Sequence, residues 1–208
     1  MITFFNYFVK ITGLVPALII LRMKVRYEDK AVQSKKIKGP AILMSNHTSV
    51  YDFALYLYVF FFRTLRYQMA EVLYKKPLLR LFLKLMGGIY VNRDNYDFSF
   101  MEKSKKILNK GGVVGIFPES RLPKENEARP LPFKESITIL ALETGVPIIP
   151  LYTSGNYFKK GRTKVMIGTP INARELYDHS KNEKENTKLI TVKLRERIIE
   201  LGEKNEEE

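Results

Sequence analysis

The chain has no cysteine and only two histidines among its 208 residues. The absence of cysteine excludes a thiol nucleophile, a cysteine metal site and a disulfide framework. The two histidines, His47 and His179, are far apart in the sequence, so we expect no metal site. The Gly-x-Ser-x-Gly motif that presents a nucleophilic serine in many hydrolases is also missing. Covalent catalysis through a cysteine, or through a serine of that motif, is therefore not expected.

The chain also lacks a stretch that resembles an interdomain linker. With 208 residues, of which 45% are apolar, it is long enough for one domain with a sizeable core. The 22 acidic residues are outnumbered by 35 lysines and arginines, and the formal net charge is +13. The last six residues, 203–208, carry a net charge of −3, which leaves +16 on the rest of the chain. This charge favours an anionic partner without distinguishing nucleic acid, an anionic membrane and a phosphorylated substrate.

An uninterrupted apolar run of membrane-spanning length is missing as well. Residues 1–21 hold only one charge, but Lys10, Gly13 and Pro16 interrupt the roughly 20 apolar residues that a span requires. The pattern predicts two short helices instead, and the second covers Ala17 to Lys24. A signal peptide is not indicated, because the basic residues follow the apolar run and do not precede it.

The basic flank of this run indicates where the two helices lie. Residues 22–38 include seven basic and two acidic residues, which suits anionic lipid headgroups. We therefore expect residues 1–26 to form a helical hairpin that lies in the bilayer interface and anchors the chain to a membrane. If the run spanned the bilayer, the same flank would keep the remaining chain in the cytoplasm. The alternative is an apolar N-terminal helix that completes the core or a dimer interface.

The stretch from Ser45 to Asp52 combines a histidine with a carboxylate at a short separation. Residues five apart on one regular helix point about 140° apart, so His47 and Asp52 cannot meet if both are helical. We predict a helix with Ser49 as its N-cap, which places His47 in the preceding turn and Asp52 at the third helical position. A carboxylate on one imidazole nitrogen leaves the other nitrogen free to accept a proton from a hydroxyl. The alternative is that Asp52 caps the helix and His47 is an ordinary loop residue.

Apolar strand patterns alternate with helical patterns along the chain. We expect strands at 40–44, 66–71, 88–93, 113–117, 146–152 and 164–170, and helices at 51–62, 76–86, 97–109, 188–200 and one that ends near 145. This alternation predicts a single α/β domain with a mainly parallel, mixed sheet covered by helices. We place this domain at 27–202, after the N-terminal hairpin and before an acidic tail at 203–208.

Charged side chains follow three of the predicted strands. His47 follows the first, Arg93 ends another, and Glu119 and Arg121 follow a third. Open α/β sheets bind ligands at the carboxyl ends of their strands, so we expect these residues to lie together. Two arginines can hold a phosphate monoester through charge-assisted hydrogen bonds, and Glu119 would contact a neighbouring hydroxyl or position the arginines. For each arginine alone, a surface salt bridge is the alternative.

Four short blocks occur in a characteristic order in this chain. They are Asn46-His47 to Asp52 (N-H-x4-D), Gly88 to Arg93 (G-x4-R), Phe117-Pro118-Glu119 (F-P-E) and Val146 to Pro150 (V-P-x-x-P). The quartet resembles that of the phospholipid and glycerol acyltransferases typified by 1-acyl-sn-glycerol-3-phosphate acyltransferase, and the match runs from about residue 40 to residue 170. Together the four blocks are far more specific than any one of them.

The resemblance implies roles for individual residues. In that family the histidine and aspartate of the first block are catalytic, which falls on His47 and Asp52. The arginine of the second block and the glutamate and arginine of the third bind the glycerol phosphate acceptor, which falls on Arg93, Glu119 and Arg121.

The chain departs from the family pattern at two places. Many members have Glu-Gly-Thr-Arg in the third block, whereas here Ser120 replaces the glycine and Arg121 comes one residue early. The family's F-K-x-G is similar to residues 133–136, where a serine replaces the glycine, and the resemblance suggests phosphate or donor binding for Lys134. Both departures are consistent with a different acceptor.

The resemblance implies an O-acyltransferase that moves a fatty acyl group from an acyl thioester to the free hydroxyl of a lysophospholipid. The simplest case makes phosphatidic acid from 1-acyl-glycerol-3-phosphate. Acyl-coenzyme A or acyl carrier protein would be the donor, and we expect no cofactor. His47 would deprotonate the hydroxyl directly, without an acyl-enzyme. We expect a peripheral or monotopic protein at the cytoplasmic face of a membrane, most simply a bacterial inner membrane with an anionic surface.

Three alternatives remain open at this point. They are an acyltransferase with a different acceptor, a hydrolase that uses Ser49 beside His47 as its nucleophile, and a non-catalytic lipid-binding protein. We do not expect a nucleic-acid partner, because the aromatic residues lie in apolar runs and do not alternate with the basic residues.

Overall fold

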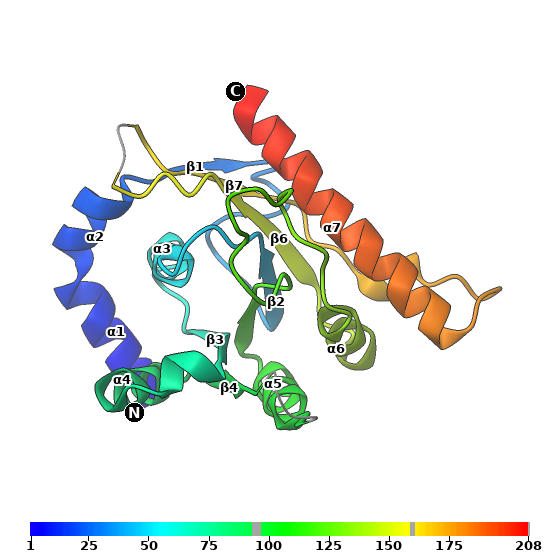
Figure 1. Cartoon of the computed structure of the whole chain (residues 1–208), viewed down its shortest axis with the longest axis horizontal. Helices are drawn as coiled ribbons and strands as arrows, with labels where there is room; N and C mark the ends of the chain where they lie inside the picture. The colour runs from blue at the N-terminus through cyan, green and yellow to red at the C-terminus, as the bar shows by residue number, and fades with distance from the viewer. Residues whose placement is uncertain (93–96, 159–160, 208) are drawn as a thin grey trace.

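A computed structural model of the chain describes residues 1–92, 97–158 and 161–207 (Figure 1). Within these ranges the strands are β1 (Lys24–Tyr27), β2 (Ala41–Ser45), β3 (Leu65–Ala70), β4 (Ile89–Val91), β5 (Val113–Ile116), β6 (Ile148–Thr153) and β7 (Lys164–Ile167). The α-helices are α1 (Ile2–Thr12), α2 (Leu14–Leu21), α3 (Asp52–Val59), α4 (Pro77–Met86), α5 (Ser99–Asn109), α6 (Ser136–Thr144) and α7 (Glu183–Glu207). Two short 3-10 helices are η1 (Glu71–Tyr74) and η2 (Ala173–Leu176).

The strands form one sheet in the order β1-β7-β6-β2-β5-β3-β4. Neighbouring strands are parallel except for β6 and β7, which are antiparallel. Parallel neighbours require long crossover connections, and the helices supply them. The predicted single α/β domain with a mainly parallel, mixed sheet is confirmed.

Helices cover both faces of the sheet. Successive strand residues point to opposite faces, so the apolar side chains of a buried strand need packing partners on both sides. In β2, Ala41 and Leu43 belong to a core cluster with side chains of α1 to α4, whereas Ile42 and Met44 belong to a cluster with side chains of α5 to α7. Figure 1 shows these two groups of helices on opposite sides of the sheet. All five residues of β2 are buried, as expected for a central strand of a covered parallel sheet. The carboxyl end of β2 is therefore held from both sides.

Helices α3 and α4 lie within the predicted ranges 51–62 and 76–86. The aromatic-rich helix α3 is a core helix, since Leu55, Tyr56 and Phe60 are completely buried. Helix α4 has Pro77 in its first turn and ends at Gly87, whose φ of +79° lies in the left-handed region that glycine adopts without strain.

Two helix boundaries near the site differ from the sequence prediction. Helix α2 ends at Leu21 and does not reach Lys24, because residues 24–27 form β1 and pair in parallel with β7. Helix α3 begins at Asp52, later than predicted, because residues 50 and 51 form a turn in front of it. Asp52 is therefore the first helical residue and not the third.

Helix α7 extends beyond both ends of the predicted range of 188–200. At its start, Asn182 Oδ1 accepts a hydrogen bond of 2.9 Å from the backbone N–H of Glu185, which satisfies an otherwise unpaired amide. At its end, Asn205 is buried, and the side chain of Arg26 donates to its carbonyl oxygen at 3.2 Å. This packing extends the helix into the acidic C-terminal residues.

The predicted N-terminal pair of helices is present as α1 and α2. None of the described helices is long and apolar enough to cross a membrane alone; α1 and α2 reach that length only together, and they are bent by 63° at their junction. The pair leaves large apolar side chains exposed, namely Phe4, Phe8, Ile11, Leu14, Val15, Leu18 and Ile19.

Lys10 docks α1 onto the end of α3. Only 1% of the residue is exposed, and its Nζ donates to the carbonyl oxygens of Phe60 at 3.3 Å, Phe61 at 2.9 Å and Arg63 at 2.7 Å. These carbonyls follow the last turn of α3, where backbone acceptors lack helical partners. Burial lowers the pKa of Lys10 to about 8. The residue that interrupts the apolar run thus joins the N-terminal helices to the domain.

Replacing Lys10 by methionine tests this contact. We expect Lys10→Met to lower the free energy of unfolding by about 1–3 kcal/mol, because buried carbonyl groups lose their donor. Lys35 is exposed, so we expect the matched Lys35→Met variant to change it by less than about 0.5 kcal/mol. Urea denaturation followed by circular dichroism measures both values. Equal stability of the two variants would show that Lys10 does not hold α1 in place.

Candidate active site

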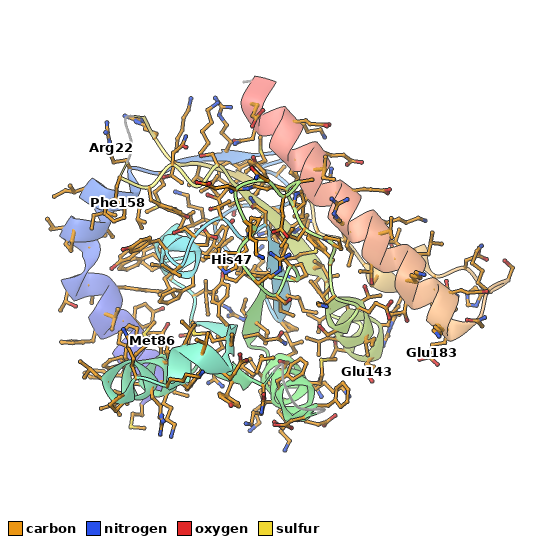
Figure 2. All side chains as sticks on the ribbon, in the orientation of Figure 1. Arg22, His47, Met86, Glu143, Phe158 and Glu183 are labelled. Carbon is orange, nitrogen blue, oxygen red and sulfur yellow. The ribbon has the colours of Figure 1, made fainter. Side chains whose placement is uncertain are left out.

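His47 lies in the loop between the carboxyl end of β2 and the start of α3 (Figure 2). Its side chain is 20% exposed, so the ring is both supported by the protein and accessible from outside. Asn46, directly before it, closes the loop against β6: its amide donates to the Thr153 carbonyl and its Oδ1 accepts from the Thr153 N–H, both at 2.9 Å. The backbone that carries the imidazole is therefore held by two hydrogen bonds to the neighbouring strand.

His47 and Asp52 are paired, as the sequence predicts. The distance between His47 Nδ1 and Asp52 Oδ2 is 2.9 Å, and the aspartate side chain is completely buried. No described residue is hydrogen-bonded to His47 Nε2. An imidazole held through one nitrogen by a carboxylate leaves the other nitrogen available for proton transfer.

The Asp52 carboxylate accepts hydrogen bonds from the imidazole, two backbone amides and two hydroxyl groups. Oδ2 accepts from the backbone N–H groups of Thr48 at 2.6 Å and Ser49 at 2.9 Å, in addition to the imidazole. Oδ1 accepts from the Thr48 hydroxyl at 2.9 Å and from the Tyr157 hydroxyl at 2.7 Å. Every donor limits rotation of the carboxylate, so its orientation toward the imidazole is determined by the protein.

Tyr157 comes from the loop after β6, 105 positions from Asp52 in the sequence. Burial, followed by the charge of Asp52, raises the pKa of Tyr157 far above the ordinary value of a tyrosine. Its hydroxyl therefore stays protonated and donates to the carboxylate. No local sequence pattern indicates this contact, because it depends on the loop after β6 folding over the start of α3.

An aromatic stack sets the plane of the His47 ring. The imidazole stacks on Phe117 with a centroid distance of 4.3 Å and an angle of 16°, and Phe117 stacks on Tyr67 at 5.3 Å and 20°. The Tyr67 ring in turn lies against Gly115, where an added Cβ would be 2.2 Å from a ring carbon. Only glycine at this position of β5 leaves room for the stack.

Glu119 joins the end of β5 to the His47 loop. It is buried, its Oε1 accepts from the His47 backbone N–H at 2.7 Å, and its Oε2 accepts from the Leu131 N–H at 2.7 Å. Burial raises the pKa of Glu119, although both backbone hydrogen bonds act in the opposite direction. The structure thus brings Glu119 beside His47, as expected from their places at strand ends. The role of Glu119 in binding the glycerol phosphate acceptor stays a prediction.

The other residues predicted to bind substrate are Arg93, Arg121 and Lys134. Arg93 lies outside the described residues. The Arg121 guanidinium is 45% exposed and forms two hydrogen bonds with the Glu127 carboxylate, at 2.6 and 2.7 Å. Lys134 is exposed, and its backbone N–H donates to the Pro118 carbonyl at 2.9 Å. Phosphate or donor binding by these side chains stays a prediction.

The third block retains the local geometry that a glycine would favour. Ser120 stands at the position where the resemblance leads us to expect glycine, and its φ is +62°, in the left-handed region that glycine adopts most easily. The substitution therefore leaves a strained serine at the turn that carries Glu119 and Arg121. Among the described residues, no group of three or more His, Cys, Asp or Glu side chains is placed to hold a metal ion.

The chain matches the family model described as Acyltransferase over residues 22–154. A 1-acyl-sn-glycerol-3-phosphate acyltransferase from Borreliella burgdorferi is 30% identical over 130 residues, which cover 59% of this chain and 50% of that protein. The protein of the same name from Bacillus subtilis is 29% identical over 145 residues, which cover 67% of this chain and 70% of that protein. The match thus spans half the length of the first relative and somewhat more than two thirds of the second.

The fold has a counterpart among solved structures. The crystal structure of the 1-acyl-sn-glycerophosphate (LPA) acyltransferase PlsC from Thermotoga maritima superimposes with a TM-score of 0.60 and covers 97% of this chain and 95% of that chain. The two sequences are 18% identical, so this likeness concerns the fold alone.

The tautomer of His47 tests the pairing without any assay of activity. In the neutral ring we expect the proton on Nδ1, because Asp52 accepts a hydrogen bond there. In Asp52→Ala we expect the form with the proton on Nε2 to appear. Nitrogen-15 NMR of the imidazoles distinguishes the two forms, and the exposed His179 is an internal control whose signals should not change. Identical His47 signals in both proteins would mean that Asp52 does not set the tautomer.

Proposed function

Since the chain belongs to the acyltransferase family, we propose that it transfers a fatty acyl group from an acyl thioester to the free hydroxyl of a lysophospholipid. The most specific form of the proposal is the conversion of 1-acyl-glycerol-3-phosphate to phosphatidic acid. The names of the relatives from Borreliella burgdorferi and Bacillus subtilis support this acceptor. The contact that carries the proposal is the hydrogen bond of 2.9 Å between His47 Nδ1 and the buried Asp52 carboxylate.

The reaction requires one proton to be moved twice. His47 Nε2 removes the proton from the acceptor hydroxyl while the oxygen attacks the thioester carbonyl. The tetrahedral intermediate then breaks the carbon–sulfur bond, and the imidazolium returns the proton to the departing thiolate. Asp52 stabilises the imidazolium and maintains the orientation of the ring. The acyl group passes directly to the acceptor oxygen, so no acyl-enzyme forms, consistent with the absence of cysteine.

The remaining site residues hold the substrates and the loop in this proposal. Glu119 accepts the His47 backbone N–H and so positions the imidazole relative to the end of β5. Arg93, Arg121 and Lys134 are assigned to the phosphate of the acceptor or to the donor, where cationic side chains form charge-assisted hydrogen bonds. For Arg121 this role requires its guanidinium to exchange Glu127 for the phosphate. The donor is acyl-coenzyme A or acyl carrier protein, and no metal or further cofactor takes part.

In this proposal the N-terminal helices attach the protein to the membrane that contains its lipid substrate. The exposed apolar side chains of α1 and α2 enter the acyl boundary of the bilayer, and the basic residues of 22–38 contact anionic headgroups. A product with two acyl chains is costly to release into water, but it can pass sideways into the leaflet. We assign the protein to the cytoplasmic face of a membrane, where it is peripheral or monotopic.

Replacing His47 tests the chemistry. We expect His47→Ala to lower kcat/KM by at least about 100-fold, because the general base is lost. His179→Ala is the matched control and should retain full activity, since His179 is exposed and far from the site. Labelled acyl-coenzyme A or acyl carrier protein, offered with a panel of lysophospholipids, measures the transfer and identifies the acceptor. Binding to vesicles should be the same in all three proteins.

Two outcomes of this experiment would contradict the mechanism. Full activity of His47→Ala would mean that another group removes the proton or that the protein functions without catalysis. An acyl group on Ser49, detected by mass spectrometry after incubation with the donor, would indicate a hydrolase-like covalent route. In the structure the Ser49 hydroxyl oxygen accepts a hydrogen bond of 3.2 Å from the Tyr51 N–H.

The exposed apolar face of the N-terminal helices is tested with a matched pair of substitutions. Val15 on α2 is 67% exposed and Val192 on α7 is 50% exposed. We expect Val15→Asp to weaken binding to vesicles of phosphatidylcholine and phosphatidylglycerol by roughly tenfold, because a charge enters the acyl boundary. Val192→Asp should bind like the unaltered protein. Cosedimentation measures binding, and an equal effect of both substitutions would contradict the proposed orientation on the bilayer.

A further inference from the structure

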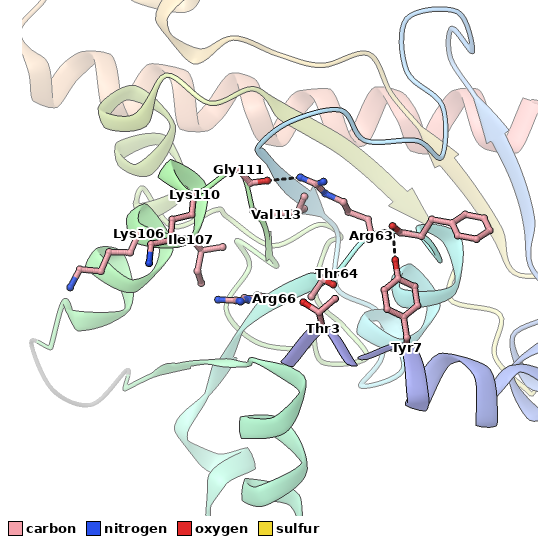
Figure 3. A pocket seen from close by; sticks show the side chains of 12 residues that line it. Thr3, Tyr7, Arg63, Thr64, Arg66, Lys106, Ile107, Lys110, Gly111 and Val113 are labelled. Carbon is pink, nitrogen blue, oxygen red and sulfur yellow. Dashed lines mark hydrogen bonds between the residues drawn. The ribbon is translucent and has the colours of Figure 1, made fainter. Parts of the chain in front are cut away.

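A cavity of about 410 Å³ opens at the amino ends of β3 and β5 (Figure 3). It is lined by residues of α1, of the segment that leads into β3, of α5 and of the turn before β5, namely Thr3, Tyr7, Arg63, Thr64, Arg66 and Lys106 together with Phe62, Ile107 and 110–113. His47 and Glu119 follow the carboxyl ends of β2 and β5. The cavity therefore lies at the opposite edge of the sheet from the imidazole, and the proposed reaction does not use it.

The lining of this cavity is strongly cationic. Arg63, Arg66, Lys106 and Lys110 contribute side chains to it, and no aspartate or glutamate is among the lining residues. In Figure 3 the Arg66 guanidinium points to the same side of the cavity as Lys106 and Lys110. Like charges that converge repel one another, and a bound anion reduces this repulsion.

One of the two arginines of the cavity, Arg63, is held by backbone carbonyl groups. One terminal nitrogen of Arg63 donates to the carbonyl oxygens of Gly39 at 2.6 Å and Gly111 at 2.5 Å, which leaves its remaining N–H groups for other acceptors. Figure 3 shows the bond to Gly111. Arg66 projects from β3, and its stem passes close to Gly87, where an added Cβ would be 3.4 Å from Arg66 Cγ. The Arg63 and Arg66 guanidinium groups and the neighbouring hydroxyls of Thr3 and Thr64 supply donors that suit the acceptor oxygens of a phosphate.

The position of α1 indicates where such a phosphate comes from. Thr3 and Tyr7 of α1 line the cavity, and on the same helix Phe4, Phe8 and Ile11 are exposed. One helix thus separates the cationic cavity from an apolar face. If that face enters the acyl boundary of a bilayer, the cavity lies at the level of the lipid phosphates.

We propose that this cavity binds a phosphate group, supplied by the headgroup of an anionic membrane lipid or by a soluble phosphate. Arg63 and Arg66 form the charge-assisted hydrogen bonds, and Lys106 and Lys110 add positive charge at the opening. The site lies beside the membrane-facing helix and is separate from the site of acyl transfer. It gives the protein a second contact with lipid that depends on headgroup charge and not on apolar burial.

Two lysine pairs of equal charge and spacing test the proposal. Lys106→Gln/Lys110→Gln removes two exposed lysines at the cavity, one on α5 and one directly after it. Lys184→Gln/Lys188→Gln removes two exposed lysines, also four residues apart, from the start of α7. The α7 pair lies on the other side of the molecule from α1 (Figure 1). Arg66→Gln is a third variant inside the cavity. All four residues of the pairs are on the surface, so the double variants should fold normally.

The first measurement uses inorganic phosphate and the full-length protein. We expect titration with phosphate to shift the backbone NMR signals of Thr64, Gly111 and Gly112, which lie at the cavity. The cavity double variant and Arg66→Gln should bind phosphate roughly tenfold more weakly, whereas the α7 double variant should bind it like the unaltered protein. Equal phosphate affinity in all variants, or shifts only near His47, would overturn the proposal for a soluble phosphate.

The second measurement uses vesicles of phosphatidylcholine with and without phosphatidylglycerol. If the ligand is a lipid headgroup, the cavity double variant should lose roughly tenfold in affinity for the anionic vesicles, and the α7 variant should lose little. A loss in this arm alone identifies the lipid, and a loss with inorganic phosphate alone identifies a soluble ligand. No difference between the two double variants in either arm overturns the proposal. Neither arm measures acyl transfer, so the result does not depend on the proposed reaction.

Discussion

The buried carboxylate of Asp52 is the group on which the arrangement of the site depends. An isolated carboxylate without water is unfavourable, and this one is stable because the Thr48 and Ser49 amides, the Thr48 hydroxyl, Tyr157 and the imidazole all donate to it. These donors come from the loop after β2 and the loop after β6. The carboxylate therefore joins two segments distant in sequence and at the same time orients the ring that carries the proposed chemistry.

The sheet supplies the rest of the support for the imidazole. Glu119 at the end of β5 accepts the His47 backbone N–H, and Phe117 from the same strand end stacks on the ring. The stack continues to Tyr67 on β3, which fits only because Gly115 has no side chain. Parallel strands end at the same edge, so three neighbouring strands contribute to one small site. A change inside the sheet at Gly115 would thus reach the ring through two aromatic contacts.

The N-terminal helices connect this site with the cationic cavity at the opposite edge of the sheet. Lys10 attaches α1 to the end of α3, and the first residue of α3 is Asp52. On another side of α1, Thr3 and Tyr7 form a wall of the cavity, while Phe4, Phe8 and Ile11 are exposed. One helix therefore contacts the core, the cationic lining and the surroundings of the protein. This arrangement explains why a buried lysine is tolerated in an otherwise apolar segment: its charge is matched by backbone carbonyls.

The sequence by itself determined the alternation of strands and helices, the cap at Gly87 and the pairing of His47 with Asp52, because each depends on residues close together in the chain. It also placed His47 and Glu119 at one edge of the sheet, since parallel strands share an edge. Only the tertiary structure decided that Tyr157 donates to Asp52, that Glu119 holds the His47 backbone and that Arg121 pairs with Glu127. It also decided the length of α7 and the late start of α3. These features depend on packing between segments that are far apart in sequence, or on competing local hydrogen bonds. Neither can be predicted from the spacing or the periodicity of residues along the chain.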